Sequence, residues 1–60
     1  MTFRELERIV TTDGWMRKAS IGSHIQYNHP TKPGKVTIPN HRGDLKPAVV
    51  HSVLKQARLK

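Results

Sequence analysis

The chain has 60 residues, of which 11 are Lys or Arg and four are Asp or Glu, so its formal net charge is +7. This length predicts one domain over residues 1–60 with a small core. The lack of cysteine excludes disulfides and cysteine-ligated zinc, and there is no apolar run of about 18 residues to span a membrane. The first residues do not resemble a signal peptide, so we expect a cytoplasmic protein.

The positive charge is concentrated in the second half of the chain. Residues 1–30 carry four basic and three acidic side chains, a net charge of +1. Residues 31–60 carry seven basic side chains and one acidic side chain, a net charge of +6. Such an asymmetry in a short chain is typical of proteins with an anionic partner, and general solubility is the alternative explanation.

The first predicted element is a helix over residues 2–12. Thr2 and Glu5 have the spacing of a capping box, in which each side chain accepts a hydrogen bond from the other residue's backbone. Apolar residues then recur at helical spacing, at Phe3, Leu6, Ile9 and Val10. Asp13-Gly14 predicts the end of this helix.

Three short strands are predicted next. They cover residues 15–19, 23–29 and 35–39, separated by a turn at 20–22 and a loop at 30–34. In the second strand Ile25 and Tyr27 alternate with His24 and Gln26, which predicts one apolar and one polar face. His29 is expected at the surface of the following loop.

A second helix is predicted from Lys46-Pro47, because proline is tolerated in the first turn of a helix. Its apolar face consists of Val50, Val53, Leu54 and Ala57. The order helix, three strands, helix predicts an α+β fold, with a three-stranded antiparallel sheet and two helices on one face. The other face of the sheet is then polar and carries His24.

The four histidines do not have the spacing of a metal site. They are separated by five, twelve and ten residues, and only four carboxylates accompany them. We therefore expect no metal and no other cofactor. RNA cleavage does not require a metal, because the 2′-hydroxyl of RNA is itself the nucleophile. A histidine among cations can move the proton of that hydroxyl, since the imidazole side chain titrates near neutral pH.

Four segments carry a resemblance to a known family. They are Gly14-Trp15, Gly22-Ser23-His24-Ile25-Gln26-Tyr27, Val36-Thr37-Ile38-Pro39-Asn40-His41 and Leu54-Lys55-Gln56-Ala57-Arg58-Leu59. In this order they resemble the HicA toxins, which are mRNA interferases of type II toxin–antitoxin systems. The resemblance implies a fold like a double-stranded-RNA-binding domain, in the order α-β-β-β-α. It also implies a metal-independent endoribonuclease that inhibits translation and growth, with His24 as the catalytic residue, and a HicB-type antitoxin that neutralises it.

The last helix departs from the family pattern in three places. Ala48-Val49 stand where the family commonly has Gly-Thr, and His51 stands where it often has Arg. Arg58 replaces the glycine that closes the helix. None of these changes involves His24, but they bear on RNA contacts of this helix and on where it ends.

We expect further RNA contacts from Ser23 and His41 and from several cations. The cations are Arg17, Lys18, Lys32, Lys35 and Arg42. Two other functions remain open from the sequence. A non-catalytic module that binds double-stranded RNA would use the same cations and leave His24 with a structural role. A subunit whose main surface faces a protein partner is also compatible with the toxin assignment.

Overall fold

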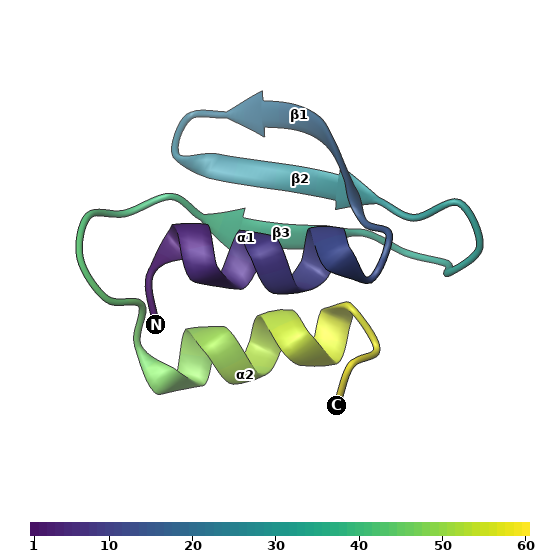
Figure 1. Ribbon diagram of the computed structural model, residues 1–60. Helices are drawn as coiled ribbons and strands as arrows, with labels where there is room; N and C mark the ends of the chain where they lie inside the picture. Colours follow the sequence, from purple (N-terminus) through teal and green to yellow (C-terminus); the bar gives the residue numbers. More distant parts are fainter.

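Two helices and three strands follow one another in the predicted order in the computed structural model, which describes residues 1–60 (Figure 1). The elements are α1 (Phe3–Thr12), β1 (Met16–Ile21), β2 (His24–Asn28), β3 (Val36–Pro39) and α2 (Pro47–Gln56). The strands form one open sheet in the order β1-β2-β3, and both strand pairs are antiparallel. The α+β fold predicted from the sequence is therefore confirmed. Neither helix is long and apolar enough to cross a membrane.

The core lies between the helices and one face of the sheet. Its ten buried side chains are Leu6, Val10, Trp15, Ile25, Tyr27, Val36, Ile38, Leu45, Val53 and Ala57. Ile25 pairs with Ile38 and Tyr27 pairs with Val36, so these four residues form two apolar rows across β2 and β3. Because neighbouring residues of a strand point to opposite faces, the polar residues of β2, His24, Gln26 and Asn28, lie on the other face of the sheet.

The capping box predicted for α1 is present. The Thr2 backbone N–H donates to Oε1 of Glu5 at 2.8 Å, and the Glu5 N–H donates to Oγ1 of Thr2 at 3.2 Å. The helix ends before Gly14, which has a φ of +109°. A Cβ atom at this position would lie 2.7 Å from Nε2 of His29, so both the backbone angle and the space require glycine here.

Strand β1 is longer than the sequence predicted. The turn expected at residues 20–22 lies instead at Gly22 and Ser23, because Ile21 still pairs with His24. Gly22 has a φ of +60° at the first central position, which suits a tight two-residue hairpin turn. The pairing register also shifts between Arg17 and Ala19, which leaves Lys18 in a β-bulge.

Helix α2 begins at Pro47 as predicted, but its last turn closes without a glycine. Arg58 has a φ of +57° and is the one residue other than glycine with a positive φ. The Leu59 N–H donates to the Leu54 carbonyl at 2.9 Å, and the Arg58 N–H donates to the Lys55 carbonyl at 3.1 Å. These two bonds form the closing motif that glycine usually serves, here with an arginine in the left-handed position.

Candidate functional site

His24 opens β2 on the face of the sheet that points away from the helices. Its side chain is exposed, whereas the next residue, Ile25, is buried in the core. Its cross-strand partners are Ile21 on β1 and Pro39 on β3, so the residue lies in the middle strand with a neighbour on each side. The polar side of β2 predicted from its alternation is therefore confirmed, with His24 at its end, although Met16 and Ile21 of β1 add two apolar side chains to the same face of the sheet.

One backbone hydrogen bond brings Ser23 next to the chain that leaves β3. The Asn40 N–H donates to the Ser23 carbonyl at 2.6 Å. This bond continues the β2–β3 pairing by one residue beyond His24 and Pro39. It places His41, which directly follows Asn40, at the same end of the sheet as His24.

A hollow with a mixed lining lies between the end of β3 and the start of α2. Pro39, the partner of His24, forms part of its wall together with His41, Arg42 and Lys46. The other lining residues are Asp44, Leu45 and Val49, and His24 itself does not line the hollow. Arg42, predicted as an RNA contact, thus joins the His24 end of the molecule. Lys46 was not predicted as a contact, because its place before Pro47 indicated only the start of a helix.

The remaining predicted cations lie at the other end of the sheet. Arg17 pairs with Tyr27, near the end of β2, and Lys18 follows in the bulge. Lys32 and Lys35 belong to the β2–β3 connection, which leaves the sheet at that same end. Four residues of extended chain separate the two ends of β2, a distance of about 13 Å. The predicted RNA contacts therefore form two groups rather than one.

Two of these distal cations are engaged in ion pairs. Arg17 donates to Oε2 of Glu7 at 2.7 Å, and the same carboxylate oxygen accepts a short hydrogen bond from the Tyr27 hydroxyl. Lys32 donates to Oδ2 of Asp13 at 2.5 Å. The Lys32 hydrogen bond lowers the pKa of Asp13 below its usual value. No ion pair holds Lys18 or Lys35, and both side chains are exposed.

Lys32 also connects the ends of both helices. Besides its bond to Asp13, which caps α1, its ammonium group donates to the Ala57 carbonyl at 3.2 Å. Ala57 caps α2, so one side chain ties the C-terminal ends of α1 and α2 to the loop between β2 and β3. The ammonium group of Lys32 therefore makes hydrogen bonds that stabilise the fold, in addition to carrying a positive charge.

The prediction for His29 was wrong, because its side chain is buried rather than at the loop surface. Only 8% of the side chain is exposed. Nε2 lies 2.7 Å from the Asp13 carbonyl oxygen, and Nδ1 accepts from the Thr31 and Lys32 N–H groups at 3.0 Å each. This pattern requires the neutral ring with its hydrogen on Nε2. The ring also packs edge to face against Trp15, with centroids 5.1 Å apart.

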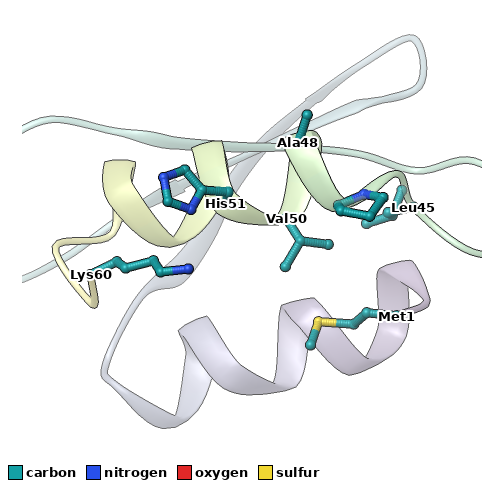
Figure 2. A pocket seen from close by; sticks show the side chains of 7 residues that line it. Met1, Leu45, Ala48, Val50, His51 and Lys60 are labelled. Atoms are coloured by element: carbon teal, nitrogen blue, oxygen red, sulfur yellow. The ribbon is translucent and has the colours of Figure 1, made fainter.

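A second hollow, which His24 does not line, lies along α2 beside Met1 and Lys60 (Figure 2). Met1, Val50 and His51 are among its lining residues, and no residue of the sheet contributes to it. His51 is exposed on α2. His29 and His51 thus lie apart from the end of the sheet that carries His24 and His41, and no three His, Asp or Glu side chains gather as metal ligands would.

Comparison with known proteins gives one informative result. A search of curated protein sequences found no relative. The family model described as HicA toxin of bacterial toxin–antitoxin systems matches residues 3–59. The match covers both helices and all three strands, including the Gly22-Ser23-His24 turn. The chain therefore belongs to the HicA toxin family.

Proposed function

We propose that this chain is an endoribonuclease toxin that uses His24 and that a HicB-type antitoxin neutralises. The observation that carries the proposal is the exposure of His24 on the open face of the sheet, where its partner Pro39 also borders a hollow that His41, Arg42 and Lys46 line with Asp44, Leu45 and Val49. In this proposal an RNA strand bound at that end of the sheet contacts the imidazole of His24 and the cations that follow β3. Membership of the toxin family supports the same assignment.

The proposed reaction uses the nucleophile that RNA supplies. The 2′-oxygen attacks the adjacent phosphorus, the bond from phosphorus to the 5′-oxygen breaks, and a 2′,3′-cyclic phosphate and a 5′-hydroxyl result. His24 takes the 2′-hydroxyl proton or delivers one to the leaving 5′-oxygen. Arg42 and Lys46 offset the negative charge that develops on the phosphate oxygens. DNA lacks the 2′-hydroxyl and is not a substrate in this scheme.

The test is the substitution of His24 by alanine. Purified His24→Ala protein, incubated with single-stranded RNA in the presence of EDTA, is expected to lose at least about 100-fold of the cleavage rate, the usual contribution of a general acid or base. Expression of this variant without antitoxin should also allow growth. His51→Ala is the matched control, since His51 is also exposed but lies on α2. Undiminished cleavage by His24→Ala would overturn the assignment of the catalytic residue.

A non-catalytic module that binds double-stranded RNA is the second candidate. It is favoured by one observation, that no side chain makes a hydrogen bond to His24 to orient its ring. The incubation with RNA and EDTA distinguishes the two functions. Discrete cleavage fragments support the enzyme. Intact RNA together with a gel shift that weakens with salt supports the binding module.

A further inference from the structure

The two edges of the sheet differ in how their backbone groups are satisfied. At the β3 edge, the Thr37 N–H donates to Oε1 of Gln56 at 2.9 Å, and α2 packs against this strand. At the β1 edge no side chain or loop bonds to the outward backbone groups. Figure 1 shows β1 on the outside of the sheet with no helix beyond it. The β1 edge is thus a free pairing edge, and the β3 edge is not.

The hairpin geometry identifies which groups of β1 are free. Ile21 and His24 flank a two-residue turn and therefore hydrogen-bond to each other, so the next pair, Ser20 and Ile25, does not. The N–H and C=O of Ser20 consequently point away from β2. The same alternation on the other side of β2 predicts a bonded pair at Ser23 and Asn40, and that bond is present at 2.6 Å.

The side chains of β1 favour contact of this edge with a protein over exposure to solvent. Met16 and Ile21 are 60% and 63% exposed, the two most exposed large apolar side chains of the chain. Their partners Asn28 and His24 lie on the outer face of the sheet, so both apolar side chains line that face beside β2. Lys18 in the bulge adds a positive charge to the same edge.

We propose that the free edge of β1 binds an extended, acidic strand of a protein partner, which adds a fourth strand to the sheet. This inference rests on the proposed function, in which that partner is the antitoxin. A backbone strand supplies both donors and acceptors for the outward groups of Ser20, and its apolar side chains can cover Met16 and Ile21. Acidic side chains on the strand complement Lys18, which no ion pair holds, and the net charge of +7 of the chain.

Two other occupants fit this edge less well. A second copy of the chain would bring together two molecules that each carry a net charge of +7. A nucleic-acid backbone offers phosphate acceptors, and in RNA 2′-hydroxyl donors, but not the regular alternation of N–H and C=O groups with which a strand pairs. The acidic protein strand is therefore the occupant that satisfies the backbone, the apolar side chains and the charge together.

Docking on this edge has a consequence for the candidate site. Ile21 is the cross-strand neighbour of His24, so an added strand lies two strand spacings from β2, about 10 Å. Side chains of that strand on the outer face can reach across Ile21 toward His24. Pairing with β1 thereby offers the partner a direct way to cover the exposed histidine.

The first experiment measures amide hydrogen exchange of the full chain, alone and in complex with a HicB-type antitoxin. We expect the Ser20 amide to exchange at least about tenfold more slowly in the complex. The Thr37 amide is the internal control, because Gln56 already holds it in the free chain. A complex in which Ser20 exchange is unchanged would overturn the edge inference alone. Failure to form any complex would overturn the proposed partner, and with it this inference.

A pair of variants tests the same contact by affinity. Ser20→Pro removes the outward N–H without removing a β1–β2 hydrogen bond, so we expect about tenfold weaker binding of the antitoxin. Ser20→Ala keeps the N–H and is expected to bind within about twofold of the unmodified chain. Equal affinities of the two variants would count against strand addition. Slower Ser20 exchange on addition of RNA alone would assign the edge to nucleic acid instead.

Discussion

His24 and His29 belong to one alternating segment but end on opposite faces. The alternation that places Ile25 and Tyr27 in the core also predicts the outward direction of His24, which the structure confirms. Continued for one more step, the same alternation points His29 inward. The neighbouring Pro30 indicated a loop instead, and polarity indicated the surface. Sequence alone does not reveal that a carbonyl and two N–H groups are positioned to satisfy the ring.

Replacing His29 by alanine is expected to destabilise the fold strongly. The change leaves the Asp13 carbonyl and the Thr31 and Lys32 N–H groups without their partner and opens a cavity beside Trp15. Together these losses should lower the free energy of unfolding by about 2–4 kcal/mol, measured by urea denaturation. His51→Ala, at an exposed position of α2, should change it by less than about 0.5 kcal/mol. Similar values for both variants would contradict the structural role given to His29.

At the scale of single elements, the boundaries set by local chemistry were predictable and those set by pairing were not. The capping box of Thr2 and Glu5 and the position of Pro47 each locate a helix start in the sequence. The end of β1 depends on which two residues form the turn. Gly22 was expected to be the last residue of that turn, whereas it is the first, and Ile21 therefore remains in the strand. The β-bulge at Lys18 has no sequence signal comparable to the capping box or to Pro47.

A substitution at the C-terminal end of α2 is expected to stabilise the protein. Arg58 adopts a φ of +57°, which an L side chain disfavours and glycine does not. Arg58→Gly should therefore raise the free energy of unfolding by about 0.5–1 kcal/mol, once the greater freedom of glycine in the unfolded chain is included. Arg58→Ala removes the same charge but keeps the disfavoured angle, so it should give no gain. A gain with alanine equal to that with glycine would assign the effect to charge.

At the scale of the whole molecule, the positive charge is distributed differently along the sequence and over the folded surface. The sequence assigns most of the positive charge to residues 31–60. In the fold, Arg17 and Lys18 from the first half meet Lys32 and Lys35 from the second half at one end of the sheet. His41, Arg42 and Lys46 occupy the end near His24. The charges of the two halves of the chain predict a cationic protein. The pairing of the strands determines which of its cations lie on the same surface.

If RNA runs along the open face from His24 to the distal end, the unpaired cations there bind phosphates. Lys18→Gln with Lys35→Gln should then weaken RNA binding and reduce the slope of log affinity against log salt by about 0.7 for each phosphate that is no longer neutralised. Binding is measured in His24→Ala protein, so that the RNA stays intact. Lys55→Gln with Lys60→Gln removes the same charge near the end of α2 and should leave the slope closer to that of the parent. Equal reductions in both double variants would mean that net charge alone, and not a path along the sheet, holds the RNA.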